Sequence, residues 1–163
     1  MTELVEAMGI NAPSLYATYG DKRCLFLTAL RSYQQSQREW MTKLLTSGQP
    51  ARQVLRQLLE AMVEESLSDP DRKGCFMVNT TTELANQDEE IFRLVAENER
   101  SMRGALVQLV QQGKENGEFS LERDSPLVAT YLFTVIQGLR LIAATHQDRA
   151  QLRATVEMIL DTL

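Results

Sequence analysis

The chain has 163 residues, of which 44% are hydrophobic and 24% are charged, and its net charge is −5. This length suits one domain, or one domain with a small appendage, and the composition excludes a disordered or fibrous protein. The negative charge argues against nucleic-acid binding over the whole surface. Residues 1–48 nevertheless contain five basic and four acidic side chains, so the excess negative charge lies in the rest of the chain.

The first part of the chain has the spacing of a helix-turn-helix. Gly9 can end a first helix over residues 3–8, because glycine adopts the left-handed backbone conformation without strain. Asn11 suits the N-cap of a second helix, and Pro13 fits its first turn, where a missing N–H costs little. Two helices are therefore predicted within a very short stretch.

The second helix is predicted to have one inward face. Leu15 and Tyr19 are four residues apart and lie on the same side of a helix. Gly20 ends this helix, and Asp21 caps a third one. The residues expected to point outward are Asn11, Ala12, Ser14, Tyr16 and Thr18.

This stretch resembles the DNA-binding signature of the TetR/AcrR family of transcriptional regulators. The matching positions are Gly9, Ile10, Leu15, Tyr16, Tyr19, Lys22 and Leu25. The resemblance implies an all-α regulator, a repressor in type, that binds a double-stranded DNA operator as a homodimer. The residues implied to face bases are Asn11, Ala12, Pro13 and Ser14. Tyr16 and Lys22, with the N-terminus of the third helix, would hold phosphates.

The sequence departs from the family pattern in two ways. Thr18 stands where the family usually has histidine, so a phosphate contact expected there is weaker or absent. The family's first helix should precede this stretch, so the DNA-binding domain, residues 1–46, is expected to be incomplete at its N-terminus. The alternative function is a helical ligand-binding dimer that no longer binds DNA. For the glycine-and-cap pattern alone, an ordinary helical corner is the alternative.

The remainder, residues 47–163, is predicted to be a helical ligand-binding and dimerisation domain. Apolar residues at helical spacing predict helices over residues 23–45, 51–67, 75–85, 88–112, 125–144 and 149–163. Residues 75–85 are rich in valine and threonine and would also suit a strand, but no partner strand is visible. A turn is predicted over residues 113–120.

The last two helices are predicted to form the dimer interface. The helix over residues 125–144 is apolar on nearly all sides and must be covered on all of them. A homodimer through residues 125–163, packed as a four-helix bundle, would cover it, as the resemblance also implies. The alternative is a central helix in a monomer. Polar residues, including Arg140, interrupt this run, so no membrane span is predicted.

A small effector is expected to bind inside the helical body and to change DNA affinity by moving the two reading helices of the dimer. The candidate pocket residues are Met62, Cys75, Phe76, Met77, Asn79, Phe92, Met102, Tyr131 and Phe133. These thioethers and aromatics favour an apolar or aromatic effector. The alternative for each residue is a place in the core.

No cofactor, metal site or catalytic centre is predicted. A single histidine, His146, excludes a metal site built on a histidine pair, and no glycine-rich phosphate loop occurs. Cys24 and Cys75 form no CxxC motif and no signal peptide is visible, which is typical of the reducing cytoplasm. Cys75 follows Arg72 and Lys73, which suggests a redox sensor; a buried, inert thiol is the alternative.

Overall fold

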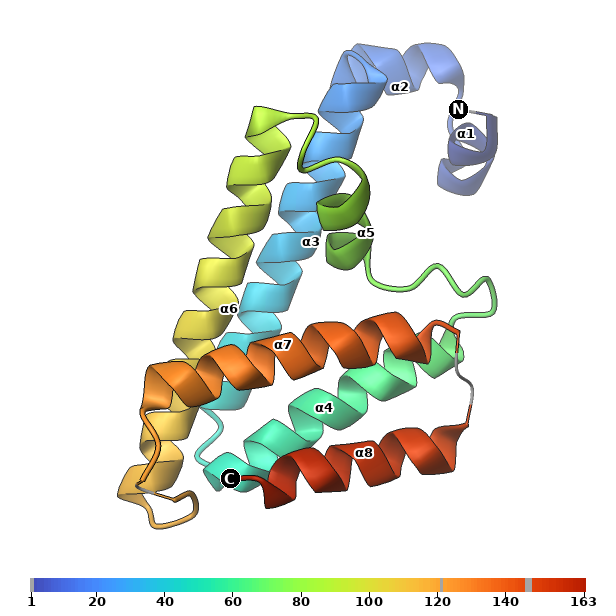
Figure 1. Ribbon diagram of the computed structural model, residues 1–163. Coiled ribbons are helices and arrows are strands. Elements are labelled where there is room, and N and C mark those ends of the chain that lie inside the picture. The colour runs from blue at the N-terminus through green and yellow to red at the C-terminus, as the bar shows by residue number, and fades with distance from the viewer. Residues whose placement is uncertain (1, 121, 146–147) are drawn as a thin grey trace. The chain divides into compact units, whose positions relative to one another are not determined.

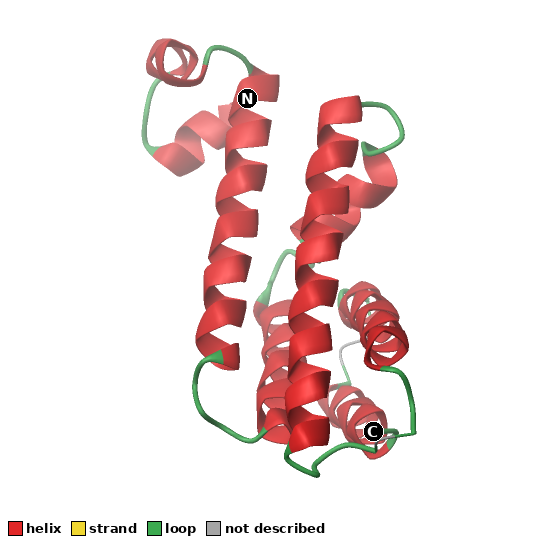
Figure 2. Ribbon diagram, turned by 90° about the vertical axis from the view of Figure 1, so that its left-hand side faces the viewer, coloured by secondary structure: helices red, strands yellow, loops and turns green. Residues whose placement is uncertain are grey.

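The computed structural model describes residues 2–120, 122–145 and 148–163. Over these residues the chain forms eight α-helices and no strand (Figures 1 and 2). The predicted all-α fold is confirmed. The chain divides into two compact units, Met1–Ser36 and Gln37–Leu163. Their limit falls inside a helix, whereas the sequence places the domain boundary between residues 46 and 47, which stays a prediction.

The first unit contains α1 (Thr2–Met8), α2 (Ala12–Tyr19) and the start of α3 (Lys22–Leu45). Both turns rely on positive backbone angles, with φ of +63° at Gly9 and +79° at Gly20. The Oδ1 atom of Asn11 accepts the N–H of Ser14 at 2.8 Å, which confirms the predicted cap of α2. Leu15 is fully buried on the inward face of α2.

The second unit is built around α4 (Ala51–Ser68). This helix packs against α6 (Glu89–Glu115), α7 (Ser125–Ala143) and α8 (Arg149–Asp161), and α6 also packs along α7 and α5 (Phe76–Glu83). Figure 1 shows α4, α7 and α8 running alongside one another. The fully buried core side chains include Leu55, Leu58, Leu59, Leu106, Leu109, Leu132 and Leu160. Burial of these apolar side chains supplies most of the stability of such a core.

One predicted boundary is wrong. The sequence places a turn from Gly113 onward, but α6 continues to Glu115 and the turn follows it. Gly113 is buried within the helix because the ring of Phe119 folds back onto its Cα side. Phe119 is itself only 5% exposed. A glycine that a ring covers in this way does not end its helix, although glycine usually signals an end in sequence.

One helix bears on the expectation that no segment spans a membrane. By length and composition α7 could cross a membrane, despite the polar residues within it. This is weak support for a span, since core helices of soluble proteins meet the same criterion. Leu132 and Ile136 of α7 are buried in the core of the second unit, which identifies α7 as a core helix.

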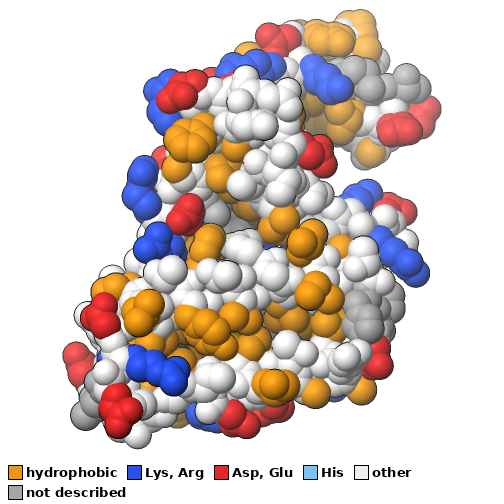
Figure 3. Space-filling model, viewed as in Figure 1, with side chains coloured by type: hydrophobic (Ala, Val, Ile, Leu, Met, Phe, Trp, Pro, Cys, Tyr) orange, Lys and Arg blue, Asp and Glu red, His pale blue; other side chains and the backbone are white. Residues whose placement is uncertain are grey.

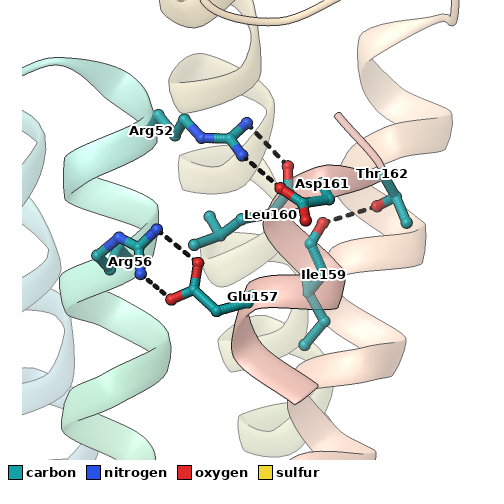
Figure 4. A network of polar contacts seen from close by, with 7 residues as sticks. All are labelled: Arg52, Arg56, Glu157, Ile159, Leu160, Asp161 and Thr162. Atoms are coloured by element: carbon teal, nitrogen blue, oxygen red, sulfur yellow. Dashed lines mark hydrogen bonds and ion pairs between the residues drawn. The ribbon is translucent and has the colours of Figure 1, made fainter. Parts of the chain in front are cut away.

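Charged side chains join α4 to α8 at both ends. At one end, Arg56 forms a two-pronged ion pair with Glu157, one contact of which is 2.8 Å (Figure 4). Beside it, Arg52 donates to the Oδ1 of Asp161 and to the carbonyl oxygen of Leu160, each at 2.9 Å. At the other end the signs are reversed: Glu64 on α4 pairs with Arg149 at 2.6 Å and with Arg153 at 3.2 Å on α8.

Candidate functional sites

The residues expected to contact DNA lie on α2 and on the first turn of α3. All of them are exposed: Asn11, Ala12, Pro13, Ser14, Tyr16, Thr18 and Lys22. Tyr16, the largest, is 45% exposed. The structure thus brings the whole predicted set together in one short segment. Ala17 is exposed there as well and is missing from the predicted set, which assigns the base contacts to residues 11–14.

Two polar groups on this face already have intramolecular partners. The hydroxyl of Thr18 donates to the carbonyl oxygen of Ser14 at 2.9 Å. The side-chain oxygen of Asn11 accepts the backbone N–H of Ser14. Within Ala12–Tyr19, all of which the structure describes, the hydroxyls of Ser14 and Tyr16 have no such contact.

The N-terminus of α3 is occupied by Asp21. Its Oδ1 atom accepts the backbone N–H of Cys24 at 2.7 Å. This hydrogen bond is the main reason that the pKa of Asp21 lies below its ordinary value of 3.8. The carboxylate is therefore charged at neutral pH and competes with a phosphate for this helix end. Tyr16 and Lys22, the other predicted phosphate contacts, are both exposed, and their role stays a prediction.

The nine residues proposed to line one effector pocket are distributed over the second unit. Cys75, Phe76 and Asn79 line a cleft of about 400 Å³, named here the Cys75 cleft. Met77 and Phe133 line a second cleft of about 230 Å³, named the Met77 cleft, together with Val78, Val95 and Gln137 among others.

The other four candidates lie elsewhere. Met102 lines a third cleft, of about 340 Å³, beside Met41. Met62 is a core residue at 2% exposure. Phe92 and Tyr131 are 53% and 40% exposed and line none of these three clefts. The structure does not gather the nine residues in one cleft, because helical spacing gives the inward face of each helix but not which faces meet around an empty space; effector binding by any of them stays a prediction.

Arg140 is the functional candidate that sequence reasoning missed. It lies on the inner side of α7, is only 7% exposed and lines the Cys75 cleft. Its Nη1 atom donates to the Sγ of Cys75 at 2.8 Å, and its Nη2 atom donates to the Oε1 of Gln37 at 3.5 Å. The signal in the sequence is a single arginine within the apolar run of α7. A buried charge needs a partner, so such a residue indicates a polar contact inside the protein.

No three His, Cys, Asp or Glu side chains gather to hold a metal ion among the residues that the structure describes.

Large apolar side chains are exposed on the last two helices, and Figure 3 shows hydrophobic groups along the face where α7 and α8 lie. These side chains are Leu127, Tyr131, Leu141 and Ile142 on α7, and Met158 on α8, at 40–71% exposure.

Comparison with known proteins decides the family. A family model described as the tetracyclin repressor-like C-terminal domain matches residues 50–159. The chain belongs to the TetR family. Membership confirms that it is a helical transcriptional regulator rather than an enzyme.

Regulators of known sequence resemble this TetR-family chain over most of their length. The HTH-type transcriptional regulator YezE of Bacillus subtilis is 29% identical over the whole chain and 84% of its own length. The HTH-type transcriptional repressor ComR of Escherichia coli is 27% identical over 88% of the chain and 69% of its own length.

A solved structure resembles the chain equally closely. A cysteine mutant of the TetR-family regulator CifR, complexed with 26-base-pair operator DNA, is 28% identical. The match covers 99% of this chain and 84% of that one, with a TM-score of 0.82. The reduced form of NemR from Escherichia coli, at 19% identity and a TM-score of 0.77, shares the fold.

Proposed function

We propose that this TetR-family chain binds double-stranded operator DNA as a homodimer and represses transcription until a small effector binds. The observation that carries the proposal is the exposed face of α2, set in a chain that matches CifR over 99% of its length. CifR was solved on operator DNA, and ComR is named a repressor. Such a regulator would act in the cytoplasm.

The proposed contacts divide into two kinds. The exposed residues of α2 would enter the major groove, as the second helix of a helix-turn-helix does. Tyr16 and Lys22 flank this face and would bind phosphates, which position the protein without reading sequence.

The exposed apolar face of α7 and α8 supports the homodimer. Leu141 and Met158 are 61% and 71% exposed. Large apolar side chains that gather on one face of a protein usually mark a surface that another molecule covers. A second copy, related by a twofold axis, would cover the same face on both subunits. The two copies of α2 would then meet two half-sites of one operator.

The Met77 cleft supports an apolar or aromatic effector. Its lining includes Met77, Val78 and Phe133, with Gln137 to orient a polar group. An effector lowers DNA affinity only if it binds more tightly to a conformation that fits DNA poorly. The Cys75 cleft, which contains the buried cation of Arg140, would suit a more polar compound.

The proposal is tested by selecting binding sites for the chain from random duplex DNA and measuring the affinity of the selected duplex against salt concentration. The variant Lys22→Ala should weaken binding to every duplex and lower the slope of log affinity against log salt by about one. Lys43→Ala removes the same charge from an exposed position outside the proposed face and serves as the control.

The outcomes separate clearly. Lys43→Ala should keep the parent slope, because its ammonium group meets no phosphate. Equal slopes for parent, Lys22→Ala and Lys43→Ala would contradict the phosphate contact. A selection that enriches no sequence would overturn the proposed function itself.

A further inference from the structure

The face that α2 offers to DNA has few polar groups with which to read bases. Three exposed side chains on α2 contain no hydrogen-bonding atom: Ala12, Pro13 and Ala17. Pro13 and Ala17 are four residues apart and therefore lie on the same side of the helix, opposite the buried Leu15. The centre of the outward face is thus apolar.

The polar side chains at its edges are restricted. An asparagine recognises adenine by donating from its amide nitrogen and accepting at its amide oxygen. The oxygen of Asn11 already accepts the N–H of Ser14 at 2.8 Å, which holds the amide at the end of the helix and leaves one lone pair and the amino group for a base. The hydroxyl of Thr18 is directed to the carbonyl oxygen of Ser14, so its outer surface is mainly its methyl group.

One base presents an apolar group in the major groove, namely thymine, through its C5-methyl. We propose that α2 reads its operator chiefly through contacts with thymine methyl groups, and that Ala17 is a specificity-determining residue. Pro13 packs beside Ala17 in the same contact, and Ser14 adds one hydroxyl. The inference rests on the proposed function, since it assigns the chemistry by which that face recognises DNA.

This mode of reading has its own signature. Contact between methyl groups involves no charge, so its contribution to affinity is independent of salt concentration. The contribution of Lys22, by contrast, falls as the salt concentration rises. Removing one methyl group from a contacted thymine should weaken binding about fourfold, the value for one buried carbon. Reading by hydrogen bonds would be indifferent to the methyl group.

The test uses the unchanged protein and the duplex obtained by selection from random DNA. Each thymine is replaced in turn by uracil, which keeps every hydrogen-bonding group and removes only the methyl. About a fourfold loss is expected at one or more thymines in each half-site, with the same ratio at low and high salt. Returning a methyl group, by restoring thymine, should recover the affinity.

A variant then assigns the contact to Ala17. In Ala17→Gly, the uracil penalty at the thymine that Ala17 contacts should disappear while penalties elsewhere persist. Ala17→Ser keeps the β-carbon and should retain the penalty. Circular dichroism checks that the helix content of the whole chain is unchanged, and the substitutions in the DNA do not depend on any variant.

Failures of the two proposals can be told apart. If the selection enriches no sequence, DNA binding and this inference both fall. If a sequence is enriched but uracil changes its affinity by less than about 1.5-fold at every thymine, DNA binding stands and methyl reading is overturned. If the uracil penalties persist unchanged in Ala17→Gly, the role of Ala17 is overturned.

Discussion

Gly113 and Phe119 show how a single pair can decide where a helix ends. An added β-carbon at Gly113 would overlap the ring of Phe119. We therefore expect Gly113→Ala to lower the free energy of unfolding by about 1–3 kcal/mol, because the ring must leave its buried position. Urea unfolding followed by circular dichroism measures this.

Gly104 is the matched control for that substitution. It lies in the same helix, and a β-carbon there would have open space around it. Gly104→Ala should raise the free energy of unfolding by about 0.5–1 kcal/mol, since alanine favours a helix over glycine. Equal effects of the two substitutions would show that the ring does not constrain Gly113.

Other residues show what the sequence could and could not predict at this scale. Asn11 and Asp21 were predicted as caps and are caps, because a cap depends only on residues three positions apart. Arg140 was seen only as a break in an apolar run, because its partner Cys75 is 65 positions away. Ala17 lies outside the predicted base contacts, residues 11–14, and its exposure is known only from the structure.

At the scale of elements, the start of α4 is held by a side chain from the turn after α6. The backbone N–H groups of Ala51 and Arg52 donate to the two carboxylate oxygens of Glu118, at 3.0 and 2.9 Å. Burial alone would raise the pKa of Glu118, but these N–H groups, with the amide of Asn116, lower it below its ordinary value of 4.5. Glu118 thus acts as the cap that Pro50, at the N-cap position, cannot supply.

This contact makes stability depend on pH. Because the folded state holds Glu118 at a lowered pKa, its contribution is fully present above 4.5 and is lost as the pH falls through the folded value. Glu118→Gln should therefore lower the free energy of unfolding by about 1 kcal/mol at neutral pH, after allowing for solvent screening. The difference from the parent should shrink towards about pH 3.

Thermal unfolding over that pH range measures the difference, with Glu115→Gln as control. Glu115 is an exposed glutamate at the C-terminal end of α6, three residues before Glu118, so its substitution should give a difference that changes little with pH. A Glu118→Gln curve that stays parallel to the parent would rule out the cap.

The sequence predicts the bounds of some helices better than those of others. Helices α4 and α7 carry repeating apolar residues and local stop signals, so sequence alone places them within a few residues of their observed bounds. The valines and threonines of residues 75–85 suit a strand as well as a helix, and the structure confirms the helix, α5. The end of α6 was misplaced because Phe119 acts on Gly113 through tertiary packing. The clefts depend on how helices meet, which no local pattern contains.

At the scale of the whole molecule, the proposed dimer can be tested through its exposed apolar face. Leu141→Glu places a carboxylate where the partner copy would bury it without a counter-charge, so the dimer should dissociate. Phe92→Glu introduces the same charge at a similarly exposed residue of α6, outside that face, and should leave the mass unchanged. Sedimentation equilibrium distinguishes them.

The association state of the unsubstituted chain is measured first. A parent chain that sediments as a monomer at micromolar concentration would contradict the dimer. So would a dimer that Leu141→Glu leaves intact.

The ion pairs between α4 and α8 also determine what α8 offers to a second copy. Each exposed pair is worth only about 0–1 kcal/mol, so Leu152, Val156 and Ile159 supply most of the attraction between these helices. The signs, however, are opposite at the two ends of each helix. Reversing α8 would set its arginines against those of α4, whereas sliding it by one turn, about 5.4 Å, would break only some of the pairs, because the charges on both helices repeat every four residues. The charges thus favour the antiparallel orientation of α8 on α4, in which Leu152, Val156 and Ile159 are buried and Met158 is exposed.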